Sequence, residues 1–181
     1  MKVFYTASYY GKTKYQEYFD LVRKTLQKTG VELISPETGN YLTLLKLEDY
    51  SKVRSKKRLH YEAIRRGIQW SQTTIIEVSH EDFQLGHEAS LAIQGKKPVL
   101  CLSIHEDFSK KISNPYFFGA KYNEYNIEEI IGEFIKRAEK ETLNQRFNLF
   151  LSSRHLQKLS LSAKEKGMNN SEYLRMLIDN S

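Results

Sequence analysis

The fold is decided by TTIIEVSHEDFQLGHEASLAIQGKKPVLCL, which covers residues 73–102. A run of β-branched residues, 73–76, begins this stretch, and an apolar run over residues 98–102 ends it. Between the two runs lie a polar loop and a helix rich in small residues, from Ala89 to Gly95. Buried strands that alternate with helices are typical of parallel sheets covered by helices. The stretch therefore predicts a strand–loop–helix–strand unit of an α/β fold.

The same alternation extends over the first part of the chain. Residues 3–7 and 31–34 predict two further strands. The helix between them has apolar side chains at intervals of three and four, and Gly30 suits a left-handed cap at its end. The remaining elements are helices at residues 59–70 and 127–142 and an edge strand or turn at residues 116–119. We expect a doubly wound parallel sheet of the flavodoxin or Rossmann type over residues 1–143.

The composition limits the classes of protein to which the chain can belong. Its 181 residues, 40% of them apolar, suffice for one core and a small second unit. The chain has a single cysteine, Cys101, which lies in an apolar strand. One cysteine excludes a disulfide framework within the chain and favours a reducing, cytoplasmic compartment. No apolar run approaches the length of a membrane span, and the chain opens on a strand rather than a signal peptide.

The charged residues and histidines narrow the choice of partners. The net charge of +6 suits an anionic partner or a solvated basic surface. The basic run from Lys52 to Arg58 likewise suits phosphate or DNA binding, or a solvated helix face. The five histidines have no spacing typical of metal ligands, so we predict neither a metal nor a cofactor.

Two carboxylates flank the loop in the deciding stretch. Asp82 and Glu88 stand where the carboxyl end of a strand meets a helix, the edge at which open parallel sheets bind ligands. An ionised carboxylate there can attack a sugar C1′ or stabilise an oxocarbenium-like transition state, and the helix dipole favours the charge on Glu88. Gly86 allows a ligand to approach the backbone closely. The alternatives are a loop-capping role for Asp82 and a surface helix start for Glu88.

These motifs resemble the nucleoside 2-deoxyribosyltransferase family, which includes the 2′-deoxynucleoside 5′-phosphate N-hydrolases. The resemblance spans residues 2–135 and rests on two motifs, Phe4 to Gly11 and Glu77 to Leu102. It implies that Glu88 is the catalytic nucleophile or C1′ stabiliser and that Asp82 is a catalytic carboxylate, as in the transferases. It also implies a nucleoside or nucleotide-like ligand. The ligand-binding residues would be Ser8, Tyr9, Tyr10, Gly11, Gly86 and His87, with Asn114 completing the site of a neighbouring subunit.

The sequence departs from that family at two helper positions. Phe4 stands where the family often carries a tyrosine, and Ile64 stands where it carries a substrate-placing aspartate. Glu62 is the carboxylate near that second position, two residues away. General acid assistance typically contributes roughly 10²–10⁴-fold, so its loss would leave a slow enzyme or a binding domain. Tyr9 and Tyr10 suit base stacking and ordinary packing equally.

The last part of the chain, residues 144–181, is a different kind of unit. Its first residues alternate, which predicts a strand. The two sets are Phe147, Leu149 and Leu151 on one side and Arg146, Asn148 and Phe150 on the other. A helix over residues 154–166 follows, and Asn169 or Asn170 then begins a second helix, with Glu172 placed for a capping box. So short a unit cannot bury much core alone, so we expect its strand to pair with a second copy.

This unit resembles the ribbon-helix-helix family of DNA-binding proteins. In that family two chains intertwine, and their antiparallel ribbon enters the DNA major groove. The resemblance implies base contacts by Arg146, Asn148 and Phe150, and a phosphate contact at the helix start by Asn170 and Ser171. Arginine suits guanine and asparagine suits adenine, whereas Phe150 suits a thymine methyl or burial against the larger unit. The alternative is that the unit only dimerises the protein.

Two functions fit the whole chain. The first is a DNA-binding, transcriptional regulator-like protein whose residues 1–143 sense a nucleoside or nucleotide and whose residues 144–181 contact double-stranded DNA. The second is an active nucleoside deoxyribosyltransferase, or a deoxynucleoside or deoxynucleotide N-hydrolase, that uses Glu88. Both predict a homodimer or a dimer of dimers.

Overall fold

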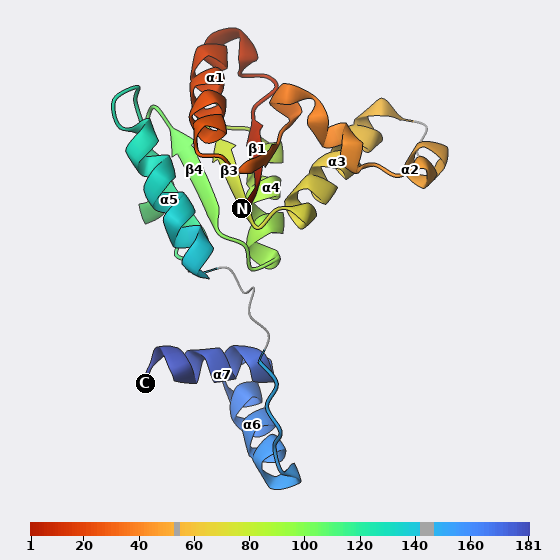
Figure 1. Cartoon of the computed structure of the whole chain (residues 1–181), viewed down its shortest axis with the longest axis vertical. Helices are drawn as coiled ribbons and strands as arrows, with labels where there is room; N and C mark the ends of the chain where they lie inside the picture. The colour runs from red at the N-terminus through yellow and green to blue at the C-terminus, as the bar shows by residue number, and fades with distance from the viewer. Residues whose placement is uncertain (53–54, 142–146) are drawn as a thin grey trace. The chain divides into compact units, whose positions relative to one another are not determined.

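The computed structural model describes residues 1–52, 55–141 and 147–181, and the chain divides into two units, Met1–Leu143 and Asn144–Ser181. Within the described residues, the first unit has a sheet of five parallel strands in the order β2-β1-β3-β4-β5 (Figure 1). The strands are β1 (Lys2–Ala7), β2 (Glu32–Ile34), β3 (Thr73–Glu77), β4 (Val99–Ser103) and β5 (Phe117–Lys121). This is the flavodoxin-like order, so the predicted parallel α/β sheet is confirmed.

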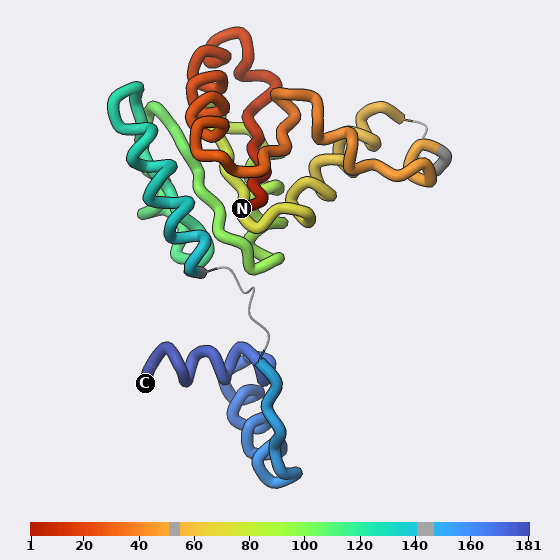
Figure 2. The backbone as a smooth tube through the Cα atoms, in the orientation of Figure 1, coloured from red at the N-terminus to blue at the C-terminus, as the bar shows by residue number. Residues whose placement is uncertain are grey.

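Helices and short 3₁₀ turns connect the strands of the first unit. They are α1 (Lys12–Lys28), η1 (Pro36–Thr38), η2 (Asn40–Leu44), α2 (Leu47–Lys52), α3 (Lys56–Trp70), α4 (Phe83–Gln94), η3 (Phe108–Lys110) and α5 (Ile127–Glu141). The backbone trace in Figure 2 shows η2 and α2 extending away from the sheet beside α3.

The sheet separates two apolar cores. On one face, Val3, Tyr5 and Ile75 pack with residues of α1 and α5. On the other face, Phe4 and Ile76 pack with residues of α3 and α4. Neighbouring strand residues point to opposite faces, which is why Tyr5 and Phe4 belong to different cores.

Close backbone contacts fix the helices on this sheet. A Cβ atom at Gly67 of α3 would lie 2.2 Å from a ring carbon of Phe4, so only glycine lets the helix pack this closely. Lys97 Nζ donates hydrogen bonds to the carbonyl oxygens of Ile68, Gln69 and Ser71, which lie at and just after the end of α3. These donors satisfy carbonyl groups that a helix end leaves without partners.

Helix α4 begins at Phe83, so the predicted start at Ala89 is wrong. The cause is the N-cap: Asp82 Oδ1 accepts a hydrogen bond from the Leu85 backbone N–H at 3.0 Å. Glu88 consequently lies in the second turn of the helix rather than the first. The favourable effect of the helix dipole on its charge is therefore smaller than expected, because that effect is confined to the terminal turn.

The second unit contains α6 (Ser153–Glu165) and α7 (Asn170–Asp179). Asn169 caps α7, and its side chain and that of Glu172 form the reciprocal bonds of a capping box, as predicted. Between the helices, Gly167 has a φ of +66°, a left-handed conformation that glycine adopts without strain.

The strand predicted at the start of this unit is absent from the described residues 147–181. Residues 147–151 have no regular secondary structure there. A strand requires a hydrogen-bonding neighbour, and in a single copy the described part of this unit supplies only helices after it. Arg146, the first residue of the predicted strand, lies outside the described residues.

Candidate functional site

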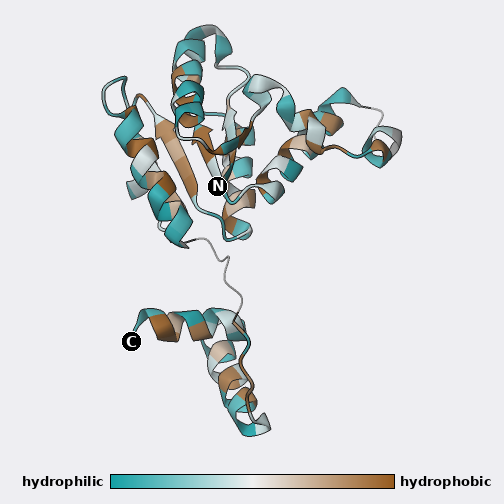
Figure 3. Ribbon diagram, in the orientation of Figure 1, coloured by the Kyte–Doolittle hydropathy of each residue, from teal (hydrophilic) through white to brown (hydrophobic). Residues whose placement is uncertain are grey.

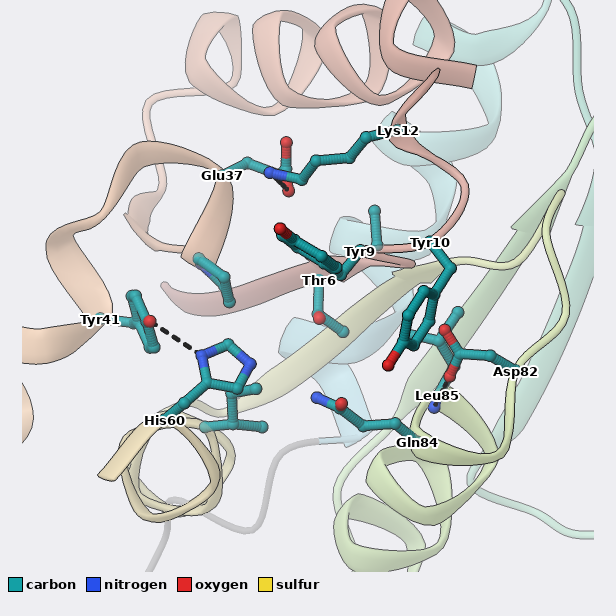
Figure 4. Close-up of a pocket in the computed structure, with 13 residues that line it drawn as sticks. Thr6, Tyr9, Tyr10, Lys12, Glu37, Tyr41, His60, Asp82, Gln84 and Leu85 are labelled. Atoms are coloured by element: carbon teal, nitrogen blue, oxygen red, sulfur yellow. Dashed lines mark hydrogen bonds and ion pairs between the residues drawn. The ribbon is translucent and has the colours of Figure 1, made fainter. Parts of the chain in front are cut away.

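A pocket of about 240 Å³ opens at the carboxyl edge of the sheet, where β1 and β3 lie side by side (Figure 4). In a sheet of this order, the connections leave β1 and β3 toward opposite faces, and the crevice between them is the usual ligand site. The loops after β1, β2 and β3 line the pocket together with α3. Its walls include Thr6, Tyr9, Lys12, Glu37, Asp82 and Gln84.

Within the described chain, Glu88 is not one of the residues that line this pocket. The side chain is 1% exposed. Its Oε1 accepts a hydrogen bond from Gln84 Nε2 at 2.8 Å, and its buried Oε2 has no hydrogen-bond partner within the described chain. Gln84, which bonds to this carboxyl group, lines the pocket, whereas Glu88 is not among the lining residues.

The environment of Glu88 raises its pKa to about 7 from an ordinary value of 4.5. Burial is the largest cause, and the charge of Asp82 acts in the same direction. The polar groups of Gln84 and Thr6 oppose the rise by favouring the ionised form. The carboxyl group can therefore exist protonated or ionised near neutral pH, which suits either an acid or a base.

Asp82 lines the pocket and also ties two loops together. Its Oδ2 accepts a hydrogen bond from Ser8 Oγ at 2.5 Å, while Oδ1 caps α4. Ser8 Oγ in turn accepts from the Gly11 backbone N–H at 3.3 Å. The loops after β1 and β3 are thus held as one surface. The capping alternative for Asp82 is confirmed, and a contact with a ligand is compatible with it.

The predicted aromatic residues lie at the pocket. Tyr9 and Tyr10 are 74% and 78% exposed, with ring centroids 5.8 Å apart in an edge-on arrangement. Such exposed rings are available for stacking on a ligand, because they are not committed to the protein core.

Further polar groups at the pocket were missed by sequence reasoning. Lys12 Nζ lies 3.0 Å from Glu37 Oε1, and Tyr41 Oη lies 2.8 Å from His60 Nδ1. Burial, and then the charge of Lys12, lowers the pKa of His60 below its ordinary value. Glu37 follows the end of the predicted second strand, so its place at the sheet edge could have been found. His60 and Tyr41 carry no comparable signal.

Five predicted ligand residues are not among those that line this pocket. Ser8 is 1% exposed, and its hydroxyl donates to Asp82. Gly11 is buried, and a Cβ there would lie 2.7 Å from that of His80, so its role is close packing. Gly86 lines a different, mostly apolar pocket of about 290 Å³. His87 stacks on Tyr61 with ring centroids 5.8 Å apart.

The fifth is Asn114, whose side chain accepts a hydrogen bond from the Tyr116 backbone N–H at 2.9 Å. This bond lies just before β5, at the opposite edge of the sheet from the pocket. A contribution of Asn114 to a second subunit's site stays a prediction.

The two departures at helper positions are not compensated nearby. Ile64 gives the pocket wall an apolar patch. Glu62 pairs instead with Arg65 at 2.6 Å and with Arg66 at 3.2 Å. Glu62 is not among the residues that line the pocket.

A second buried carboxyl group, Glu77, organises the end of β3. It accepts hydrogen bonds from the Ser79 hydroxyl and backbone N–H and from Tyr122 Oη, the last at 2.9 Å. Ser79 Oγ also accepts from the Ile104 backbone N–H at 3.0 Å. Burial raises the pKa of Glu77 to about 7. This network joins the carboxyl ends of β3, β4 and β5, and it fixes the start of the loop that carries Asp82.

Four of the five predicted DNA-contacting residues belong to the described part of the second unit, and the fifth, Arg146, lies outside it. Asn148 is exposed and Phe150 is 98% exposed. Burial of Phe150 against the larger unit stays a prediction. Asn170 Nδ2 donates to Ser160 Oγ at 3.0 Å, and Ser171 is exposed in the first turn of α7. These positions are accessible to a ligand, and their contact with DNA stays a prediction.

No group of three His, Cys, Asp or Glu side chains among the described residues is placed to hold a metal ion. No helix in the described ranges has both the length and the apolar character needed to cross a bilayer. No protein-family model matches this chain, and no curated protein matches it.

Proposed function

We propose that this chain is a DNA-binding regulator whose first unit binds a nucleoside or nucleotide-like molecule. Its second unit would dimerise as a ribbon-helix-helix and contact double-stranded DNA. The observation that favours binding over turnover is the position of Glu88, which bonds to Gln84 and, in the described chain, is not one of the residues that line the pocket. A reaction at a sugar C1′ would need direct contact with that group.

The pocket offers complementary groups for the parts of a nucleoside. Exposed Tyr9 and Tyr10 suit the face of a base, and Asp82 and Gln84 suit sugar hydroxyl groups. The volume of about 240 Å³ is near the small end of ligand pockets, which typically measure about 300–1,000 Å³. A small polar-aromatic ligand is therefore favoured over a large cofactor.

The second unit favours pairing with another copy of itself. Among its described residues, Ala163 is the one apolar side chain that is fully buried. Many others are exposed, and Figure 3 shows apolar stretches along both helices. They include Phe147, Leu149, Leu156, Leu161 and Ile178. Units shorter than about 40 residues usually need a partner, a metal or disulfides to fold, and a second copy would cover these side chains.

The charge of the second unit suits DNA. Its cations are Arg146, Arg154, Lys158, Lys164, Lys166 and Arg175, against the acids Glu165, Glu172 and Asp179. The backbone N–H groups at the start of α7 add a site for a phosphate beside Asn170 and Ser171. Ligand binding in the first unit would then act by changing the spacing of the two half-site contacts.

A second candidate function is N-glycosidic bond cleavage or transfer. The specific observation that favours it is Glu88 Oε2, which is buried without a hydrogen-bond partner in the described chain and whose carboxyl group has its pKa raised to about 7. Such a group could serve as nucleophile or acid if the Gln84 side chain turned away. Release of free base from deoxynucleosides, abolished in Glu88→Gln, would favour this function. Equal background rates in both proteins would exclude it.

The DNA proposal is tested by introducing a negative charge at the predicted phosphate contact. Ser171→Glu puts an acid in the first turn of α7, where it favours the helix but repels a phosphate. Ser90→Glu, at an exposed position of α4, makes the same change of charge in the first unit. We expect fluorescence anisotropy on a random duplex to show at least about tenfold weaker binding for Ser171→Glu alone.

Binding by the parent chain should also weaken as salt rises, because phosphate contacts release counterions. Equal affinities for the two variants would contradict the contact at α7. No salt-dependent binding by the parent chain at about 10 µM would contradict DNA binding altogether.

A further inference from the structure

We infer that the ion pair of Lys12 and Glu37 is the base-reading end of the pocket and that it selects guanine. The inference rests on the proposed nucleoside binding and adds to it the identity of the base. It starts from the contrast between the two ends of the pocket. Figure 4 shows Lys12 and Glu37 on one wall of the pocket and Asp82 and Gln84 on another. Tyr41 and His60 lie on a third wall.

Glu37 is a nearly enclosed carboxylate on a pocket wall. Its side chain is 4% exposed, yet it lines the pocket. Oε1 lies 3.0 Å from Lys12 Nζ, and Oε2 accepts from Gln16 Nε2 at 3.1 Å. The two oxygens of a carboxylate offer about four acceptor sites, so each can accept a further hydrogen bond from a ligand.

Lys12 supplies the donor beside that acceptor. An ammonium group has three donors, and Glu37 uses one of them. The Lys12 side chain is 39% exposed, and Nζ lies 5.9 Å from the centroid of the Tyr9 ring. The pocket therefore presents one cationic donor next to two anionic acceptors, close to an exposed aromatic face.

The edge of guanine matches this arrangement. It carries an acceptor, O6, followed by two donors, N1–H and the N2 amino group. Lys12 would donate to O6, and the two oxygens of Glu37 would accept from N1–H and N2–H. Hypoxanthine lacks the second donor, and adenine offers one donor beside a ring nitrogen. Hydrogen bonds to a charged and largely buried group such as the Glu37 carboxylate discriminate strongly between such ligands.

The sugar end fits the same orientation. With the base against Lys12 and Glu37, the sugar would lie toward Asp82 and Gln84, which is the side that leads to Glu88. The pair thus determines which base is bound, while the far end determines what happens to the sugar.

The test is calorimetric titration of the full chain with guanosine, inosine and adenosine. We expect guanosine to bind at least about tenfold more tightly than inosine, with adenosine weaker again. Glu37→Gln keeps the shape of the side chain but removes its charge, and it should abolish the preference for guanosine. Glu133→Gln, at an exposed position of α5, is the matched control and should leave the preference unchanged.

A second ligand keeps the inference testable if Glu37→Gln fails to fold, which circular dichroism would reveal. 1-Methylguanosine lacks the N1–H donor, so it should bind the parent chain at least about tenfold more weakly than guanosine. Equal binding of these two nucleosides, or a Glu37→Gln protein that retains the guanosine preference, would overturn the base assignment and leave nucleoside binding intact. Failure of every nucleoside to bind the parent chain would overturn both.

Discussion

Replacing Glu88 by glutamine is expected to change how the stability of the first unit depends on pH. The ordinary carboxyl pKa of 4.5 applies to the unfolded chain, whereas burial raises the pKa in the folded chain to about 7. The folded state therefore holds the proton more tightly than the unfolded state. The resulting stabilisation is complete below pH 4.5 and is lost as the pH rises through about 7.

The size of this loss follows from the two pKa values. Each pKa unit corresponds to about 1.4 kcal/mol, so ionisation of Glu88 lowers the free energy of unfolding by about 3 kcal/mol above pH 7. The glutamine does not titrate. Its carbonyl oxygen can still accept from Gln84, and its amide group replaces an oxygen that has no donor opposite it in the described chain. The variant should thus become more stable than the parent as the pH rises.

The assay is urea unfolding of residues 1–143 at a series of pH values between about pH 4.5 and pH 8. Circular dichroism monitors the unfolding. The difference in the free energy of unfolding should grow from near zero to about 3 kcal/mol in favour of Glu88→Gln. Glu77 titrates in the same range, but it is present in both proteins and cancels from the difference. Glu133→Gln should show no such growth. A difference that does not change with pH would refute the reasoning.

Three further outcomes are expected. Gly67→Ala should lower the free energy of unfolding by about 1–3 kcal/mol in urea, because the new Cβ would overlap Phe4, whereas Gly132→Ala, with no described atom within 4 Å, should stabilise α5. Asn169→Ala should cost the second unit about 1 kcal/mol in thermal unfolding of the full chain, because it removes the capping box. Light scattering should find a dimer or larger for the full chain and a smaller assembly for residues 1–143, and a monomeric full chain would contradict pairing of the second unit.

The sheet could be predicted because the residues of its central strands form distinct runs in the sequence. Residues 73–76 are a β-branched run and residues 98–102 an apolar run, and both strands are buried throughout, as expected of strands covered on both faces. The start of α4 was missed because the good helix formers Gln84, Leu85 and Glu88 are interrupted by Gly86 and His87, which have weaker helix preferences. The hydrogen bond from Leu85 to the Asp82 cap outweighs those weak preferences, and cap geometry cannot be read from composition.

Site residues could be predicted where they follow the end of a strand, because their place at the sheet edge does not depend on how other elements pack. Asp82 and Tyr9 follow directly from the ends of strands, and both line the pocket. His60 reaches the pocket from a helix whose facing direction depends on how α3 packs, so no local pattern indicates it. The hydrogen bond of Glu88 to Gln84 likewise depends on a side-chain contact rather than on spacing.

The predicted strand of the second unit illustrates a different limit. Alternation at residues 147–151 indicates which side chains would share a face, but hydrogen bonds to a neighbour are what create a strand. In one copy, the described part of this unit has no such neighbour. The alternation in the sequence therefore predicts a strand that would form only when a second copy supplies the hydrogen-bonding neighbour.

The burial of Cys101 makes the protein convenient for site-directed labelling. This residue is the chain's single cysteine, it is 5% exposed, and burial raises the pKa of its thiol to about 12. Thiolate is the reactive form, so maleimide or iodoacetamide reagents should leave it unmodified at neutral pH. A thiol introduced at an exposed position of either unit would then be the one reactive site. Spin or fluorophore pairs placed in this way could measure the distance between two copies with the natural cysteine still in place.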